Sequence, residues 1–379
     1  MTTTPSSSSL DLYSQARHEL AENGVCILRG VIPLSQVRQL RLSLEEVFAR
    51  SAHSQQTVGA RTNMTEAAHR LRQDGRGAAV LNSRGLPADS EPAETADTTH
   101  GNGQYLTEIE VGRWHPGVRQ FEHSSALPQA VAHTLGEKKH LHFYMDHMFL
   151  KEAGSQLSTA WHQDAPYFPF DCSSTDPVQV AVCWVPVDAV AANSGGMHYI
   201  KGSHRWQEYA PNTLITNDAI DPDSATPCLP NIEEGIAQGR YEAIQFTNVQ
   251  PGDVIIHHPN TVHGSYGNRS KLQRRLAASL RYVGSDVAWC HKKTNPKGHQ
   301  LKQQWSMARD TGLLTMAALM VRRILYSCNW MKDEDFYKEA HVWAPKEMQD
   351  GVTLGATAVG RVAFPVVWRC GEEGVRSKL

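Results

Sequence analysis

Two polar residues, His162 and Asp164, stand one position apart in the segment AWHQDAPYFPF at 160–170. Residues i and i+2 of a β-strand point to the same face, so the imidazole and the carboxylate would project together while Gln163 points away. Non-haem Fe(II) sites bind their metal through two histidines and one carboxylate. The pair is therefore either part of such a ligand set or an ordinary hydrogen-bonded pair at the end of a strand.

A second histidine would have to come from a distant strand, and the segment QPGDVIIHHPNTVHGSYGNRS at 250–270 offers three. His257 and His258 are neighbours, so on a strand only one of them can face an interior. His263 follows this apolar run and precedes a Gly-Ser pair that allows close approach of the backbone. Histidines that are half-buried for other reasons are common, so spacing alone does not choose among the three.

A cosubstrate with two carboxylates would also need a basic anchor. Arginine suits this role because its planar guanidinium binds both oxygens of a carboxylate. The segment KLQRRLAASLRYV at 271–283 carries Arg274, Arg275 and Arg281. On a strand Arg275 and Arg281 share one face and Arg274 takes the other. Most arginines are solvated surface charges, so the spacing leaves the choice open.

Short β-rich runs must position these residues. They are separated by SGG, KGSH, QPGD and GNRS turns, and many short strands without helices between them predict a sandwich or a barrel. The runs are HLHFYMDHMFLKE at 140–152, QVAVCWVPVD at 179–188, GGMHYIKGSH at 195–204, DVIIHHP at 253–259 and RLAASLRYV at 275–283.

The flanking segments have other patterns. Helical spacing predicts helices at 11–23 and from Pro33 onward, where Leu34, Val37, Leu40, Leu44 and Val47 recur on one face, and again at 300–345. Residues 24–28 resemble a short strand. Residues 54–104 are polar with weak periodicity, which favours long loops or an active-site lid.

The totals exclude several classes of protein. The chain has 379 residues, 40% of them hydrophobic, and a formal net charge of −2, so no global basic field favours nucleic acid or a membrane surface. Seven scattered cysteines without a CxxC motif indicate a reducing compartment. The start MTTTPSSSSL lacks a secretory signal and no apolar stretch is long enough to span a bilayer.

The last three residues, Ser377, Lys378 and Leu379, form the peroxisomal address SKL. We therefore expect the peroxisomal import receptor as a partner and the peroxisome as the location. Without that signal, we would expect the cytoplasm.

Several blocks in order resemble the phytanoyl-CoA dioxygenase family of Fe(II)/2-oxoglutarate-dependent oxygenases. The likeness runs from about Gly24 to the FPVVW segment near 368, and the blocks are WHQDAPYFPF, VCWVPVD, NSGGMHYIKGSHRW, PGDVIIHHPNTVHGSYGNRS and RRLAASLRYVG. The resemblance implies a mainly β fold with flanking helices, the double-stranded β-helix (a cupin-like jelly roll). We expect a disordered tail at 1–10, one dioxygenase domain at 11–370 with its jelly-roll core at about 140–285, and a C-terminal tail at 371–379.

The resemblance also implies roles for individual residues. His162, Asp164 and His263 match the iron ligands. Arg275 matches the arginine that binds the far carboxylate of 2-oxoglutarate, although alignment from the distal histidine selects Arg274 instead. Trp184 and Ser265 match further contacts of this cosubstrate. Fe(II), 2-oxoglutarate and O2 are the expected cofactors and cosubstrates, with ascorbate as a reductant.

The intact Asp164 distinguishes oxygenation from halogenation, because halogenases of this fold have a small residue in place of the carboxylate. We expect oxidation of a C–H bond, by hydroxylation, desaturation or cyclisation, in a specialised metabolite or a lipid-like molecule. The aromatic residues Tyr167, Phe168 and Phe170 are candidates for the substrate wall.

The alternatives are a peroxisomal acyl-CoA α-hydroxylase, a zinc-dependent hydrolase and a non-catalytic jelly-roll binding protein. The basic run HKKTNPKGHQLK at 291–302 would suit the phosphates of CoA. A hydrolase would normally show HxH or HExxH; the sequence has no HExxH, and its one HxH, at 140–142, lies in the first of the β-rich runs and not among the matched ligands. A decayed binding protein would be expected to lack some of the matched residues, and none is missing.

Overall fold

The computed structural model describes residues 7–50, 60–71, 73, 103–136, 140–168, 170–215, 225–288 and 366–369. Four earlier expectations lie largely or wholly outside this part of the chain. They are the helix at 300–345, the basic run at 291–302, the tail at 371–379 with its SKL end, and most of the loop segment at 54–104.

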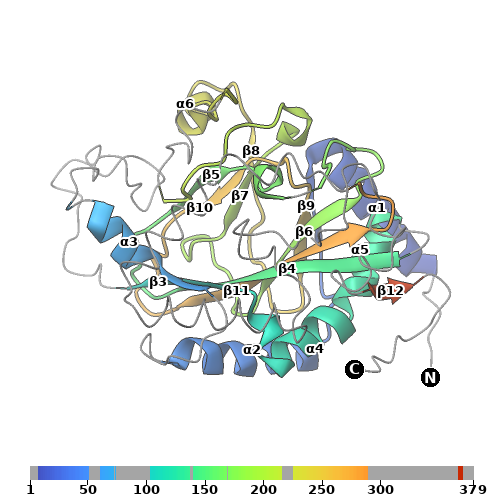
Figure 1. Cartoon of the computed structure of the whole chain (residues 1–379), viewed down its shortest axis with the longest axis horizontal. Coiled ribbons are helices and arrows are strands. Elements are labelled where there is room, and N and C mark those ends of the chain that lie inside the picture. The colour runs from blue at the N-terminus through green and yellow to red at the C-terminus, as the bar shows by residue number, and fades with distance from the viewer. Residues whose placement is uncertain are drawn as a thin grey trace, which may run out of the picture.

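Two antiparallel sheets face each other and form the expected jelly roll (Figure 1). The larger sheet has the order β1-β9-β6-β11-β4-β3-β2, and β12 also pairs with β4. Its strands are β1 (Val25–Leu28), β2 (Ala60–Asn63), β3 (Tyr105–Ile109), β4 (His140–Lys151), β6 (Val180–Pro186), β9 (Val254–His257), β11 (Arg275–Gly284) and β12 (Val366–Arg369).

The smaller sheet has the order β5-β10-β7-β8 and lies opposite the larger sheet (Figure 1). Its strands are β5 (Thr159–His162), β7 (Met197–Ile200), β8 (Ala243–Gln245) and β10 (His263–Ser265). The loops between strands carry the short helices η5 (Ala165–Tyr167), η6 (Ser203–Arg205) and α6 (Ile232–Ala237).

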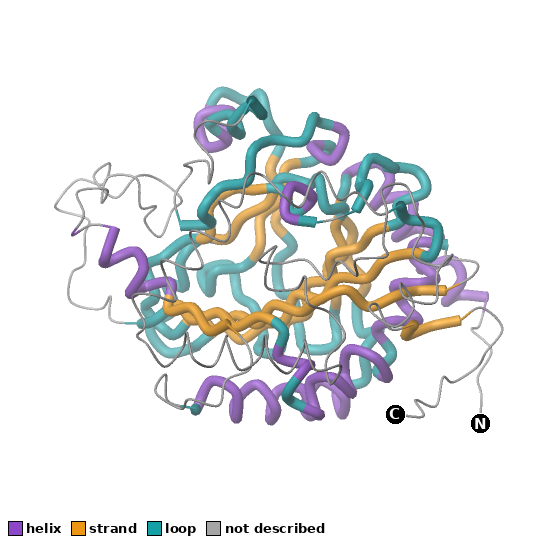
Figure 2. Tube along the Cα trace, in the orientation of Figure 1, coloured by secondary structure: helices purple, strands orange, loops and turns teal. Residues whose placement is uncertain are grey.

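Helices cover the outer face of the larger sheet (Figure 2). They are α1 (Ser7–Asn23), α2 (Leu34–Ala49), α4 (Pro116–Ser124) and α5 (Leu127–Leu135), with the single turn η4 (Val111–Arg113) before α4. In α2 the predicted apolar face is buried from Val37 to Val47, whereas Leu34 is 63% exposed because it stands at the first turn. No helix in the described ranges is long and apolar enough to cross a membrane.

One expectation is corrected in the segment at 54–104. It contains β2 and the helix α3 (Met64–Leu71), where loops or a lid were expected. Met64 and Ala68, one helical turn apart, pack with Tyr105 and Leu157. Ala67 packs against the same cluster, so α3 does have an apolar face, but the helix is only eight residues long and its pattern does not stand out within a polar segment.

Strand β11 separates the helical core from the interior between the sheets. All ten of its residues are buried. Leu276, Ala278, Leu280 and Tyr282 join the core beneath the helices, and the alternate residues from Arg275 to Arg281 face the other way. A strand buried on both faces usually carries apolar residues on both, so the arginines on the inner face mark the interior as a site.

A buried pair of carboxyl groups, Glu122 of α4 and Asp146 of β4, lies on the helical side of the sheet. Asp146 accepts hydrogen bonds from the backbone N–H groups of Val111 (2.9 Å) and Gly112 (3.0 Å). Burial, together with the adjacent Asp146 carboxylate, raises the pKa of Glu122 well above its usual value. Burial raises the pKa of Asp146 as well, but the hydrogen bond with Glu122 and the two backbone N–H groups oppose that rise, so the proton of the pair resides on Glu122.

This pair predicts a loss of stability as pH rises. The folded state holds a proton on Glu122 that the unfolded chain releases near its ordinary pKa of about 4.3. Stability is therefore fully present below that pH and falls by about 1.4 kcal/mol per pH unit until the folded pKa is reached. Glu122→Gln keeps a hydrogen-bond donor but cannot ionise. In urea titrations at increasing pH, the free energy of unfolding of this variant should therefore decline less steeply than that of the wild type. Glu66→Gln, with a side chain 55% exposed in the native protein, serves as the control and should retain the wild-type slope. An unchanged slope in Glu122→Gln would contradict the assignment.

Candidate metal centre

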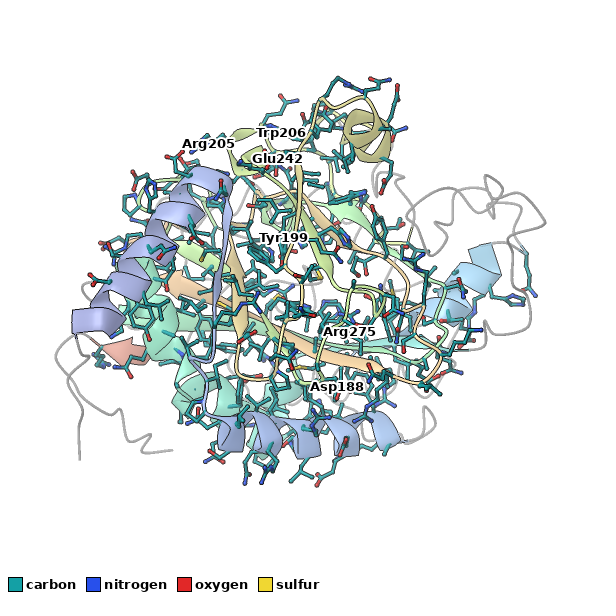
Figure 3. All side chains as sticks on the ribbon, turned by 180° about the vertical axis from the view of Figure 1, so that it is seen from behind. Asp188, Tyr199, Arg205, Trp206, Glu242 and Arg275 are labelled. Carbon is teal, nitrogen blue, oxygen red and sulfur yellow. The ribbon has the colours of Figure 1, made fainter. Side chains whose placement is uncertain are left out.

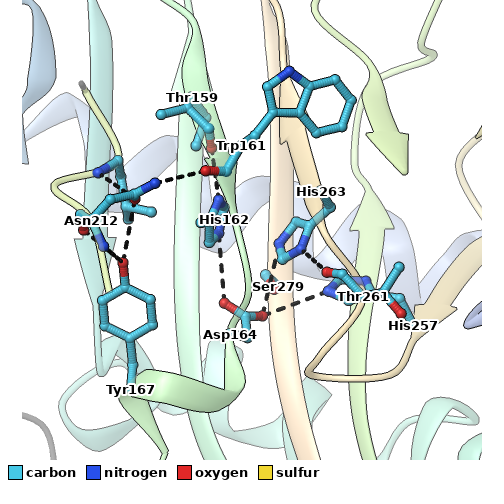
Figure 4. Close-up of polar contacts among 12 residues, drawn as sticks. Thr159, Trp161, His162, Asp164, Tyr167, Asn212, His257, Thr261, His263 and Ser279 are labelled. Carbon is cyan, nitrogen blue, oxygen red and sulfur yellow. Dashed lines mark hydrogen bonds and ion pairs between the residues drawn. The ribbon is translucent and has the colours of Figure 1, made fainter. Parts of the chain in front are cut away.

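Three side chains converge between the sheets: His162 at the end of β5, Asp164 two residues later and His263 at the start of β10. One ligand atom from each lies within 4.8 Å of the others. Asp164 Oδ1 is 3.7 Å from His162 Nε2, and Asp164 Oδ2 is 3.9 Å from His263 Nε2 (Figure 4). All three residues are buried. The cluster forms because His162 and His263 are direct partners across the β5–β10 pair.

Asp164 reaches this cluster by a route that strand alternation did not predict. β5 ends at His162, and Asp164 has helical backbone angles (φ −80°, ψ −32°) at the start of η5. Its backbone N–H donates to Pro259 O at 2.8 Å, and this bond holds the turn in place. Gln163 points away, as expected, and its amide donates to Asn260 O (3.0 Å). The Asp164 backbone and the neighbouring Gln163 side chain are both hydrogen-bonded, and these bonds fix the position of the carboxylate.

The two histidines are in the state that a metal requires. His162 Nδ1 lies 2.8 Å from Ala160 O, and His263 Nδ1 lies 2.9 Å from Thr261 O. A carbonyl oxygen only accepts, so each Nδ1 carries the proton and each Nε2 presents a lone pair to the cluster. Burial lowers the pKa of His162 to about 3 and that of His263 to about 4, so both rings are neutral at pH 7.

The third ligand is ionised. Burial alone would raise the pKa of Asp164, but the facing His257 imidazole and the charge of Arg281 hold this pKa below its ordinary value. Arg281 Nη2 lies 3.9 Å from Asp164 Oδ2. Two neutral imidazoles and one carboxylate are the donor set typical of a mononuclear non-haem iron site, so these residues fit a divalent metal.

The neighbouring histidines of β9 diverge, as predicted for adjacent strand residues. His257 faces the interior, with Nε2 3.6 Å from Asp164 Oδ2. His258 points away: its Nε2 donates to Ser174 O (3.1 Å), and its Nδ1 accepts from Asn260 N–H (3.0 Å). The sequence left His257 open as a ligand, but the group of three ligands does not contain it. Its ring faces the Asp164 carboxylate instead.

The arginines are also separated by the strand. Arg275 is 1% exposed on the inner face, and its guanidinium lies 5.7 Å from the centre of the Trp184 ring. Arg274 is on the helical side, where it pairs with Glu45 and Asp188, and its side chain is 41% exposed. Figure 3 shows Arg275, at the start of β11, close to Asp188, which follows the end of β6. Only Arg275 of these two lies in the interior that holds the ligand cluster.

The interior also holds an unusual group of polar atoms that are buried and have no hydrogen-bond partner in the described structure. Native proteins bond nearly all such atoms, so a cluster of them marks a surface built for a polar ligand. The atoms are Asp164 Oδ2, Trp184 Nε1, Tyr199 Oη, both ring nitrogens of His257, Arg275 Nε and Nη2, and Arg281 Nε.

The remaining sequence-predicted residues fall into two places. Trp184 and Ser265 line the same interior as Arg275, and Lys151 Nζ donates to Ser265 Oγ at 2.8 Å. Phe168 and Phe170 are buried against Tyr144, with ring centres 5.5 and 4.8 Å apart.

Tyr167 is held by another loop, since its hydroxyl donates to Asn212 O at 2.6 Å.

Three polar residues of the interior, Lys151, Tyr105 and Thr159, were not predicted from the sequence. A lysine inside the apolar strand run of β4 was the available signal for the first of them.

A jelly roll that presents two histidines and one carboxylate between its sheets defines the class of non-haem Fe(II) oxygenases. The family model for phytanoyl-CoA dioxygenase (PhyH) matches residues 20–276, more than half of the chain. The chain belongs to this family and is an Fe(II)/2-oxoglutarate-dependent dioxygenase.

Two named relatives are similar over part of the chain. A protein of Stutzerimonas stutzeri named "Probable alpha-ketoglutarate-dependent hypophosphite dioxygenase" is 24% identical over 213 residues, which is 55% of this chain and 68% of the relative. A Caenorhabditis elegans protein named "Probable phytanoyl-CoA dioxygenase" is 27% identical over 135 residues, which is 33% of this chain and 36% of the relative. Alpha-ketoglutarate is another name for 2-oxoglutarate.

Two solved structures have similar folds. The alpha-ketoglutarate-dependent epimerase SnoN from nogalamycin biosynthesis is 17% identical, with a TM-score of 0.48 over 73% of this chain and 85% of that chain. EvdO2 from Micromonospora carbonacea var. aurantiaca, complexed with 2-oxoglutarate, is 20% identical, with a TM-score of 0.45 over 76% of this chain and 94% of that chain.

Removal of one ligand should abolish metal binding without unfolding the protein. Asp164→Ala removes a ligand atom but leaves the backbone bond from residue 164 to Pro259, so we expect Co(II) affinity to fall by at least about a hundredfold while the thermal transition stays cooperative. Calorimetric titration of the metal-free protein with Co(II) measures this change. His258→Ala removes a buried histidine that points away from the cluster, and it should keep the wild-type affinity. Wild-type Co(II) affinity in Asp164→Ala would show that this carboxylate is structural.

Proposed function

We propose that the protein oxidises a C–H bond of a small organic substrate, with Fe(II) held by His162, Asp164 and His263 and with the far carboxylate of 2-oxoglutarate held by Arg275. The supporting observation is that one interior contains both a three-ligand cluster and a buried arginine that lacks an ion pair in the described residues. Bound iron and O2 would supply the oxidant, and 2-oxoglutarate would supply two electrons as it becomes succinate and CO2.

The charge of the interior supports an anionic cosubstrate. Arg275 and Lys151 are direct partners across the β11–β4 pair, and both are fully buried. Like charges opposite each other on neighbouring strands destabilise a sheet, and burial lowers the pKa of both groups. A carboxylate bound to Arg275 would compensate this local positive charge, which is the chemistry expected of a dicarboxylic acid.

The chain's own residues would do three things in this reaction. The Nδ1 hydrogen bonds fix His162 and His263 in the ligating tautomer, and the buried walls exclude water from the reacting atoms. Asp164 occupies the position that a halide would otherwise take, which favours oxygenation. Because no proton transfer by a strong acid or base is required, the neutral histidines are compatible with this role.

We propose a specialised metabolite or a lipid-like molecule as the substrate. The aromatic cluster around Phe168, Phe170 and Tyr144 begins four residues after Asp164, and it would offer an apolar wall. An acyl-CoA is the second candidate, in keeping with the name of the Caenorhabditis elegans relative. Pooled acyl-CoAs and cell extracts, each screened for substrate-dependent succinate formation, would separate the two.

Succinate release tests the reaction class directly. The iron-loaded protein should convert 2-oxoglutarate to succinate, and the same protein loaded with zinc should not. A zinc hydrolase or a non-catalytic binding protein would form no succinate under either condition. Failure to consume 2-oxoglutarate with any substrate pool would refute the proposed reaction.

The two neighbouring arginines should differ in their effect on the cosubstrate. Arg275→Ala removes the buried guanidinium, so we expect the KM for 2-oxoglutarate to rise by about a hundredfold. Arg274→Ala removes only a surface ion pair and should change this KM by less than about threefold. Both KM values come from the rate of succinate formation at saturating substrate. The reverse order would place the clamp at Arg274.

The peroxisomal location and the import receptor stay predictions, because residues 377–379 lie outside the described residues. Fluorescent fusions with and without Ser377, Lys378 and Leu379 would test them by co-localisation with a peroxisomal marker. An identical distribution of the two fusions would contradict the address.

A further inference from the structure

A chain of hydrogen bonds runs beside Arg275 and joins both sheets. Lys151 Nζ of β4 donates to Ser265 Oγ of β10 at 2.8 Å, and Ser265 Oγ donates to Thr159 Oγ1 of β5 at 3.1 Å. Thr159 Oγ1 lies 2.8 Å from the hydroxyl of Tyr105 in β3. These four polar side chains meet in the interior, so their hydrogen-bonding capacity must be accounted for.

The chain has a direction because an amine at one end only donates here. Lys151 Nζ also donates to the backbone oxygens of Ser265 (3.3 Å) and Tyr266 (2.8 Å), so three acceptors hold its position. Ser265 accepts from the lysine and uses its single proton on Thr159. Either hydroxyl could donate between Thr159 and Tyr105; because the Thr159 proton has no other acceptor in the described residues, we assign Thr159 as the donor to the Tyr105 oxygen. At the end of this chain the phenolic proton of Tyr105 remains available to another acceptor.

Arg275 contributes two more donors at the same place. Its Nε and Nη2 have no hydrogen-bond partner, and these two groups form one edge of the guanidinium, the edge that binds a carboxylate through two parallel bonds. The same arginine lies close enough to Tyr105 for the two side chains to affect each other's pKa. Three available donor groups therefore converge where Arg275 faces Lys151 across the β11–β4 pair.

We propose that Tyr105 is a second donor to the far carboxylate of 2-oxoglutarate, beside Arg275, and that Lys151 is a positioning residue that directs the phenolic proton toward it through Ser265 and Thr159. This inference rests on the proposed role of Arg275. It assigns Lys151 a part that does not require contact with the cosubstrate, since its three donors are already used within the protein.

The test compares two ligands that differ only at the far carboxylate. 2-Oxoglutarate and 2-oxopentanoate share the keto acid, but 2-oxopentanoate has a methyl group in place of that carboxylate. Tyr105→Phe, loaded with Co(II), should bind 2-oxoglutarate about tenfold more weakly than the wild type, because a hydrogen bond to a charged group is lost. Its affinity for 2-oxopentanoate should not change. Calorimetric titration measures both.

Two sets of control variants separate this role from a structural one. Tyr282→Phe removes a buried hydroxyl from the opposite face of the sheet, where it donates to Glu122 O at 2.8 Å, and both affinities should stay at wild-type values. Lys151→Met should weaken only 2-oxoglutarate binding. Lys151→Gln lacks the charge but can still donate to Ser265, so it should bind 2-oxoglutarate more tightly than Lys151→Met. Equal affinity of the two lysine variants would remove Lys151 from the relay.

The outcomes also distinguish this inference from the proposed function. If Arg275→Ala binds both ligands with unchanged relative affinity, the interior does not hold the far carboxylate and the proposed clamp is wrong. If Arg275→Ala loses the preference for 2-oxoglutarate but Tyr105→Phe keeps it, the clamp stands and the relay is wrong. Equal weakening of both ligands by Tyr105→Phe would also overturn the relay, because that pattern indicates a change in the shape of the pocket.

Discussion

The antiparallel pairing of β5 with β10 is the constraint on which the site depends. It sets His162 directly opposite His263, and a change of register between His263 and Ser265 then brings Ser265 opposite Thr159. Side chains alternate along a strand, so a slip of one residue would turn one histidine out of the interior. Since both strands are very short, their register is held by tertiary contacts, including the two backbone N–H groups at 164–165 that bond to Pro259 O.

The larger sheet supplies the charges that this pairing lacks. The inner face of β11 carries Arg281 beside the Asp164 carboxylate and Arg275 beside Lys151. One strand therefore supports both the anionic ligand of the cluster and the cationic pocket, while its other face anchors the helices. A substitution that tilts β11 would disturb iron ligation and cosubstrate binding together. The strand is buried along its entire length because it lies between β6 and β4, with the helical core on one face and the interior on the other.

Much of the site could be predicted from the sequence because its ligands occur in local patterns. Strand alternation separated Arg274 from Arg275 and His257 from His258, and the structure confirms both separations. Alternation did not predict the position of Asp164, whose backbone is already helical. Helices α3, α4 and α5 have only eight or nine residues each, too few for a clear period. Lys151 and Tyr105 meet Arg275 only through strand pairings that local sequence does not specify.

The polar chain from Lys151 to Tyr105 also bears on how the fold and the site are connected. A purely apolar contact between β4, β3, β5 and β10 would avoid the cost of burying an amine and three hydroxyls. A polar network of this kind favours one arrangement of the strands, because a shift would separate buried donors from their acceptors. The network spans the register change between His263 and Ser265, so the hydrogen bonds that would orient the cosubstrate also hold the strand that presents the second histidine. Ser265 therefore belongs both to the polar chain beside Arg275 and to the strand that presents His263.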